Sequence, residues 1–292
     1  MKAELSQSST RAVGDILERA AKALADAGIE SARLDAELLM AVASGLERIQ
    51  VMTGAVEFTQ DVLSRYQELV ARRAGREPLA YIAGRREFFS LDLEVNPAVL
   101  IPRPETEVLV AAALEMMAER PRGAVLDLGT GSGAIAIALA ANLPHAQVVA
   151  ADISERALEM AQRNAKRLGT YDVIEFRQGD CWEAIATSSY RFDLVVSNPP
   201  YIEDGELNGL QPEVAKFEPR LALAGGADGL DFYRKICAGV REFLKPGGEL
   251  MVEIGERQAD SVVRLCRLAG CVETAVINDL AGCNRMVRAR IA

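Results

Sequence analysis

The residues with the clearest capacity for chemistry are Asn198-Pro199-Pro200-Tyr201, which follow the apolar run 193–196. Consecutive prolines remove two backbone N–H donors, so the carbonyl groups beside them are free to accept hydrogen bonds from another molecule. Asn198 adds a side-chain carbonyl acceptor, and Tyr201 adds a flat surface for a planar group. This motif therefore predicts a site that holds a planar, conjugated nitrogen.

Such a nitrogen, in an amide or an exocyclic amine, is a poor nucleophile because its lone pair is delocalised. If its two N–H bonds point at the side-chain oxygen of Asn198 and the carbonyl of Pro199, the lone pair can turn toward an electrophilic methyl group. Fixed acceptors also stabilise the developing charge, and the proton leaves late. A proline pair alone would indicate only a stiff turn, but its place after a buried strand favours catalysis.

A glycine loop, Gly129-Thr130-Gly131-Ser132-Gly133, follows a second apolar run. Glycine lets the backbone pass close to a ligand where any Cβ would collide. Asp152 lies at the end of the next predicted strand, where its carboxylate could accept hydrogen bonds from ribose hydroxyls. The loop therefore predicts a cofactor that contains a nucleoside.

The glycine loop leaves the identity of that cofactor open. Its spacing through Ala134 also satisfies the looser dinucleotide fingerprint, and a purely structural turn is a third interpretation. Asp127 favours S-adenosylmethionine, because a carboxylate there can serve a cationic amino-acid group directly or through water. A pyrophosphate would gain nothing from that charge.

Asp180, Cys181 and Trp182 follow the third predicted strand, near the expected position of the adenine. Asp180 could accept a hydrogen bond from the adenine amine, and Cys181 or Trp182 could flank the ring. For Trp182, simple packing is an equally good interpretation.

The elements that must position these motifs alternate along the chain from about residue 120. The predicted strands are Ala124–Leu128, Gln147–Ala151, Val173–Arg177, Phe192–Ser197, Glu249–Glu253 and Thr274–Asn278. Helical stretches between them include Ile135–Asn142, Glu155–Leu168 and Asp231–Leu244, and the turn Lys245-Pro246-Gly247-Gly248 separates the last of these from a strand. This alternation predicts a mostly parallel sheet with helices on both faces.

The front of the chain has a different character. Residues 1–80 carry apolar side chains at helical spacing, with Ser31 and Thr59 as candidate helix caps. Residues 81–105 predict a linker with a β-hairpin, and Thr106 is a candidate cap for the helix that follows. We therefore expect a helical domain over 1–80, the linker, and a catalytic domain over 106–292.

Composition narrows the function further. The 292 residues carry a formal charge of −9, which argues against a protein that grips a free nucleic-acid backbone. The apolar runs are too short or too charged for a bilayer, and the polar start is not a secretory signal. Five cysteines at irregular spacing and a single histidine support neither a disulfide framework nor a zinc site. We expect free thiols in a reducing cytoplasm.

With these residues in view, the sequence resembles the release-factor glutamine methyltransferases of the HemK/PrmC family over nearly its whole length. Asn-Pro-Pro-Tyr alone also occurs in other amine and amide methyltransferases, so the other matching segments are more specific. The segments that carry the resemblance are Ser31–Leu39, Arg76–Ile82, Arg86–Phe89, Ile101–Glu107, the glycine loop, Asn198–Tyr201 and Leu223–Leu230.

The resemblance implies a class I S-adenosylmethionine methyltransferase fold, with a Rossmann-like, mostly parallel seven-stranded sheet behind a small helical domain that docks the substrate. The implied reaction methylates the side-chain nitrogen (N5) of the glutamine in the Gly-Gly-Gln motif of class I peptide chain release factors. The implied protein is a cytoplasmic monomer that needs no membrane and no direct nucleic-acid contact.

The resemblance also implies roles for individual residues. The glycine loop, Asp152 and Asn198 would contact the cofactor, and Asn198 to Tyr201 would hold the glutamine. The family often has an aromatic residue directly after the aspartate that corresponds to Asp180; here that residue is Cys181, which leaves open the residue that flanks the adenine. Alternative functions are glutamine methylation of a ribosomal protein, N6 methylation of adenine in DNA, cofactor binding without catalysis, and a dehydrogenase.

Overall fold

A computed structural model describes residues 2–186 and 190–292, and the chain divides into two compact units. The first contains the residues up to Gly84 and also the segment Gln211–Phe217. The second contains Arg85–Leu210 and Glu218–Ala292. This division differs from the expected 1–80, 81–105 and 106–292, because the linker hairpin groups with the second unit and residues 211–217 group with the first.

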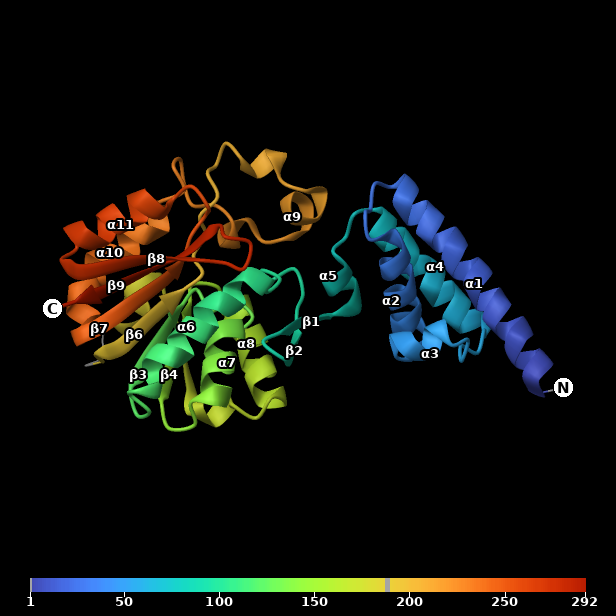
Figure 1. Cartoon of the computed structure of the whole chain (residues 1–292), viewed down its shortest axis with the longest axis horizontal. Coiled ribbons are helices and arrows are strands. Elements are labelled where there is room, and N and C mark those ends of the chain that lie inside the picture. The colour runs from blue at the N-terminus through green and yellow to red at the C-terminus, as the bar shows by residue number, and fades with distance from the viewer. Residues whose placement is uncertain (1, 187–189) are drawn as a thin grey trace. The chain divides into compact units, whose positions relative to one another are not determined.

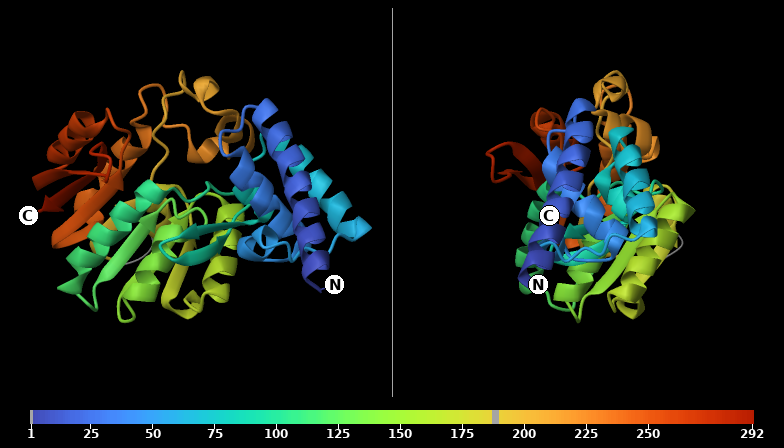
Figure 2. Two further views of the ribbon diagram at one scale, coloured as in Figure 1. Left: turned by 45° about the vertical axis from the view of Figure 1, so that its right-hand side comes forward. Right: turned by 90° about the vertical axis from the view of Figure 1, so that its right-hand side faces the viewer.

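The first unit is a bundle of helices (Figure 2). Its elements are α1 (Lys2–Asp26), α2 (Ala32–Ser44), α3 (Arg48–Met52), α4 (Gln60–Ala74), α5 (Leu79–Ala83) and α9 (Pro212–Phe217). Leu17, Leu24 and Leu39 are among the fully buried side chains of its core. The cap at Thr59 is confirmed, since its hydroxyl accepts from the Val62 amide at 3.2 Å, whereas Ser31 makes no capping bond and instead donates to Asp35.

Arg73 of α4 and Arg76, which follows that helix, hold the α9 segment in the first unit. Arg73, 7 % exposed, lies 2.7 Å from an Asp35 oxygen and 3.0 Å from a Glu213 oxygen, and Arg76 contacts the other Glu213 oxygen at 2.7 Å. Both Glu213 oxygens are therefore paired. Removal of only one partner would destabilise the unit, because it would leave a buried charge without compensation.

The second unit contains a seven-stranded sheet in the order β5-β4-β3-β6-β7-β9-β8. Its strands are β3 (Ala124–Leu128), β4 (Gln147–Asp152), β5 (Ile174–Gln178), β6 (Phe192–Ser197), β7 (Leu244–Glu253), β8 (Cys271–Asn278) and β9 (Asn284–Ile291). The first five strands pair in parallel, and β9 runs antiparallel to both β7 and β8. The predicted mostly parallel sheet is confirmed.

Helices cover both faces of this sheet because its buried strands are apolar on both sides. On β3, Val125 packs with α6 (Glu107–Ala118) and α7 (Ala134–Asn142), while Leu126 packs with α10 (Asp231–Phe243) and α11 (Ala259–Leu268). Figure 1 shows α6, α7 and α8 (Glu155–Arg167) grouped together and α10 and α11 grouped separately.

Three local expectations are corrected by the structure. Lys245–Gly248 lies within β7 as an irregularity in its pairing with β6, not as a separate turn. Strand β9 was not among the predicted strands. Thr106 makes no capping bond at the start of α6, because its hydroxyl is engaged elsewhere.

Shorter elements complete the second unit. The predicted hairpin is present as β1 (Arg85–Phe88) paired antiparallel with β2 (Leu91–Glu94). The short helical turns are η1 (Pro104–Thr106), η2 (Tyr171–Val173), η3 (Cys181–Ile185), η4 (Leu207–Gly209) and η5 (Arg220–Ala222). In the part of the chain that the structure describes, every helix is too short or too polar to span a bilayer.

Candidate active site

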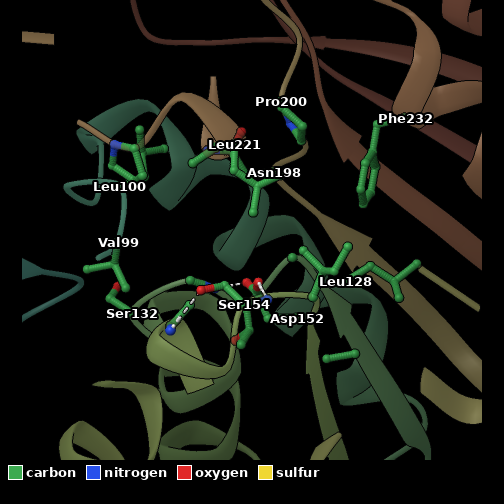
Figure 3. A pocket seen from close by; sticks show the side chains of 18 of the residues that line it. Val99, Leu100, Leu128, Ser132, Asp152, Ser154, Asn198, Pro200, Leu221 and Phe232 are labelled. Carbon is green, nitrogen blue, oxygen red and sulfur yellow. Dashed lines mark hydrogen bonds between the residues drawn. The ribbon is translucent and has the colours of Figure 1, made fainter. Parts of the chain in front are cut away.

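A cavity of about 380 Å³ opens at the carboxyl ends of β3, β4 and β6, within the second unit. This volume falls in the range of pockets that bind small molecules. Its lining combines most of the glycine loop, Asp152, Asn198 and most of segment 98–103. Figure 3 shows Asn198 and Leu221 across the cavity from Ser132 and Asp152. The cavity thus brings together the two motifs that the sequence analysis singled out.

The glycine loop divides into residues that line the cavity and one that does not. Gly129, Thr130, Gly131 and Ser132 line it. Gly129 and Gly131 have φ values of +75° and +56°, and an added Cβ would meet nothing within 4 Å, so both present bare backbone to open space. The loop therefore forms a cradle that suits a ligand passing close to its backbone.

Gly133 has a packing role and lies outside the lining. A Cβ at this position, where φ is +84°, would lie 2.8 Å from Cδ1 of Ile137 and 3.1 Å from Cβ of Ala161. The absence of a side chain lets the start of α7 approach α8. A direct cofactor contact from the Gly133 backbone stays a prediction.

Asp127 lies beneath the glycine loop, fully buried and outside the cavity lining. Its Oδ2 accepts from the Thr130 hydroxyl at 2.7 Å and from the Ala136 amide at 3.2 Å, whereas the buried Oδ1 has no partner. Burial raises the pKa of Asp127 to about 7, although these two hydrogen bonds oppose the rise. An interaction between Asp127 and the cationic group of the cofactor stays a prediction. Its unpaired oxygen is an acceptor to which a bound group or a water molecule could donate a hydrogen bond.

This raised pKa predicts a pH-dependent loss of stability. Between about pH 4 and pH 7 the carboxyl is ionised in the unfolded chain but protonated in the native protein, so stability falls as pH rises and levels off above the native pKa. Asp127→Asn lacks this titration. We therefore expect the unfolding free energy of the variant minus that of the wild type to increase by about 2–3 kcal/mol when the pH is raised from about 5 to about 8. Urea unfolding at both pH values checks this; a difference between the two proteins that does not change with pH would contradict it.

Asp152 connects the end of β4 to the glycine loop. One of its oxygens accepts from the Gly131 amide and the other from the Ser154 amide, both at 2.9 Å. Burial raises its pKa, and the amides of Ser154 and Gly131 act in the opposite direction. Asp152 lines the cavity, so its carboxylate is both fixed by the backbone and open to a ligand.

At the end of β5, Asp180 and Cys181 line the cavity and Trp182 does not. The ring of Trp182 stacks on Phe243 with 4.9 Å between centroids, and its Nε1 donates to the Lys235 carbonyl at 2.9 Å. Trp182 therefore packs against α10, and a contact between its ring and an adenine stays a prediction. Asp180 is paired with the Lys235 ammonium at 2.5 Å, and a contact between Cys181 and the adenine stays a prediction.

In the Asn-Pro-Pro-Tyr motif, Asn198 and Pro200 line the cavity. Pro199 is buried outside the lining, and among the described residues its carbonyl accepts no hydrogen bond. The Tyr201 side chain packs partly buried against the core, and burial raises its pKa to about 12. Their contacts with a substrate stay predictions.

The partners that hold this motif could not be predicted from the sequence. The side-chain nitrogen of Asn198 donates to the Thr106 hydroxyl at 3.0 Å, and that hydroxyl donates to Glu253 at 2.6 Å. The backbone of Gly225 packs closely against the motif, since an added Cβ there would lie 2.8 Å from the Tyr201 Cα. In the sequence, Thr106 is a candidate helix cap, Gly225 lies in a segment that carries the family resemblance, and Glu253 ends a predicted strand. Nothing in the sequence pairs any of them with the Asn-Pro-Pro-Tyr motif.

Family models match both parts of the chain. The model of the PrmC N-terminal domain matches residues 15–84, and the model of the methyltransferase small domain matches residues 106–214. With the sheet and cavity described above, these matches define the protein as a methyltransferase.

Comparison with curated proteins identifies the family. The chain is 47% identical to the release factor glutamine methyltransferase of Geobacter sulfurreducens over 92% of this chain and 93% of that protein. It is 43% identical to the enzyme of the same name from Koribacter versatilis, over 94% and 96% of the two chains. The chain belongs to the family of release factor glutamine methyltransferases.

Solved structures support the fold. The hMettl16 catalytic domain, crystallised with a MAT2A 3'UTR hairpin 1, superposes with a TM-score of 0.58 over 77% of this chain and 80% of that one. The identity is 16%, so the likeness concerns the methyltransferase fold alone.

Proposed function

We propose that this protein transfers a methyl group from S-adenosyl-L-methionine to the side-chain nitrogen N5 of the glutamine in the Gly-Gly-Gln motif of class I peptide chain release factors. The observation that supports this best is that Asn198 and the glycine loop line one cavity. A family of release factor glutamine methyltransferases and a site suited to an amide nitrogen point to the same reaction.

The acceptors of the Asn-Pro-Pro-Tyr motif perform the orienting step. The nitrogen of the Asn198 amide is occupied by Thr106, which leaves its oxygen to accept one N–H of the substrate amide. The Pro199 carbonyl accepts the other, so both N–H bonds are held and the lone pair is turned out of conjugation. These acceptors also stabilise the positive charge on the nitrogen until it loses one proton to water.

The residues of the cradle fit the cofactor. Gly129 and Gly131 offer bare backbone, Asp152 offers a carboxylate for ribose hydroxyls, and Asp180 with Cys181 lines the end expected to hold the adenine. When bound, S-adenosylmethionine supplies an electrophilic methyl group on a sulfonium. The chain itself contributes the orientation of the accepting nitrogen.

The helical unit is proposed to dock the release factor, and the protein to act as a cytoplasmic monomer without direct nucleic-acid contact. The match to the PrmC N-terminal domain supports a dedicated role for this unit. Helix α3 also exposes Ile49 and Met52, 60% and 50% accessible and three residues apart, so they share one face.

Incubation with labelled cofactor and three separate substrates tests this function. The substrates are a class I release factor, ribosomes and duplex DNA, each at equal concentration. We expect label in the release factor. Label confined to a ribosomal protein or to DNA adenine would replace the proposed substrate with one of those alternatives.

A further inference from the structure

Three side chains from distant parts of the chain form one hydrogen-bonded series beside the candidate active site. Asn198 follows β6, Thr106 ends η1, and Glu253 ends β7. Asn198 Nδ2 donates to Thr106 Oγ1 at 3.0 Å, and Thr106 Oγ1 donates to Glu253 Oε2 at 2.6 Å. Thr106 and Glu253 are 4 % and 2 % exposed, so the bond between them is shielded from water, whereas the bond from Asn198 lies beside the cavity.

The direction of this series is set by proton counting. A threonine hydroxyl has one proton to donate, and an ionised carboxylate can only accept. Thr106 must therefore give its proton to Glu253 and use a lone pair to accept from the Asn198 NH₂ group. The side-chain oxygen of Asn198 is left as the end that faces the cavity.

We infer that Thr106 and Glu253 are positioning residues that lock the Asn198 amide with its oxygen toward the substrate nitrogen. This inference rests on the proposed function and deepens it, because an asparagine amide has two ends of similar shape and opposite hydrogen-bonding character. The reversed amide would present an N–H donor to the N–H donor of the substrate. Only one of the two orientations supports the reaction.

Protonation of Glu253 would permit the reversed orientation. A protonated carboxyl can donate to Thr106, Thr106 can then donate to the Asn198 oxygen, and the NH₂ group turns toward the cavity. Burial raises the pKa of Glu253 to about 7, opposed by the bond from Thr106 and by the charges of Arg285 and Arg103, with Glu105 acting in the same direction as burial.

Two tyrosines also face Glu253. The Tyr233 hydroxyl donates to the Glu253 backbone carbonyl at 2.8 Å. Tyr201 lies close enough to Glu253 that the negative charge of the carboxylate raises the pKa of the phenol. Burial raises the pKa of both tyrosines, so they stay neutral near pH 7. The carboxyl is then the group of this cluster that titrates near neutrality, and turnover should rise with pH up to about 7.

The kinetic test compares Thr106→Val, Thr106→Ser and Glu253→Gln at saturating cofactor and release factor. We expect Thr106→Val to lower kcat about 10- to 100-fold with the KM for cofactor unchanged, because it removes the hydroxyl but keeps the shape. Thr106→Ser keeps the hydroxyl and should stay within about threefold of the wild type. Glu253→Gln should lose the pH dependence of kcat between about pH 6 and pH 8.

A second measurement reports the orientation of the Asn198 amide in the absence of substrate. The side-chain amide signals of Asn198, assigned by comparison with Asn198→Asp in NMR spectra, should shift with a midpoint near pH 7 in the wild type and not in Glu253→Gln or Thr106→Val. Thermal melting confirms that each variant is folded.

The outcomes separate the inference from the proposed function. The inference that Thr106 and Glu253 fix the Asn198 amide would be overturned by a wild-type kcat in folded Thr106→Val. It would also be overturned if the Asn198 signals had the same pH dependence in the wild type and in both variants. A wild type that methylates no release factor but shows the titration would overturn the substrate and leave the lock standing.

Discussion

We expect Asn198→Ala to lower the rate of release-factor methylation by about 10²- to 10³-fold and to leave cofactor affinity within about threefold of the wild type. The substitution removes one of two fixed acceptors, so the substrate nitrogen keeps its lone pair in conjugation. Asn198 is one of many residues that line the cavity, and the cradle of the glycine loop is unchanged by its loss. Single-turnover methylation and calorimetry of cofactor binding measure the two effects separately.

A matched control is Asn142→Ala. Asn142 is an exposed asparagine at the end of α7, outside the cavity lining, and among the residues that the structure describes its side chain bonds only to the Ala138 carbonyl. It should retain wild-type activity. Unchanged kcat in Asn198→Ala, with the control also active, would show that the amide does not orient the nitrogen.

Gly131→Ala should weaken cofactor binding by about 10- to 100-fold, since an added methyl group would project into the space that the ligand must occupy. The variant keeps the backbone N–H that Gly131 donates to Asp152, so the hydrogen-bond network of the loop survives. Titration calorimetry with S-adenosylmethionine or its demethylated product measures the affinity directly.

Part of the cost of Gly131→Ala is backbone strain, and Gly169→Ala isolates it. Gly169 has φ of +74° and open space around an added Cβ, as Gly131 does, but it lies on the surface after α8 and away from the cavity. Both variants should lose about 1–2 kcal/mol of stability. Equal cofactor affinity in the two variants would mean that Gly131 does not form the cradle.

The elements of the catalytic unit could be predicted from sequence because their signals are local. Buried parallel strands are short apolar runs, and predicted bounds such as Ala124–Leu128 and Phe192–Ser197 match β3 and β6. Once the strands are in order, the carboxyl ends of β3, β4 and β6 must lie together, which places the glycine loop, Asp152 and Asn198 at one cavity.

The packing of individual residues around the cavity has no local signal in the sequence. Trp182 and Gly133 stand beside residues of the cavity, yet their surroundings are Phe243 in one case and Ile137 with Ala161 in the other. Strand β9 has three arginines among its eight residues, so its apolar pattern is weak.

The Thr106–Glu253 pair shows a second limit. These residues are 147 positions apart, and each alone has an ordinary interpretation, a helix cap for the threonine and a strand end for the glutamate. The same holds for segment 211–217, whose Glu213 is paired with arginines about 140 residues earlier in the chain. Only the tertiary structure brings such groups together.

The claim that two fixed acceptors aim an amide nitrogen at an activated methyl group is tested most directly on the product. A class I release factor is incubated with cofactor and either wild type or Asn198→Ala, and its Gly-Gly-Gln peptide is sequenced by mass spectrometry. We predict one added methyl group on the glutamine side chain with the wild type and almost none with the variant. A methyl group on any other residue, or equal methylation by both proteins, would contradict the account.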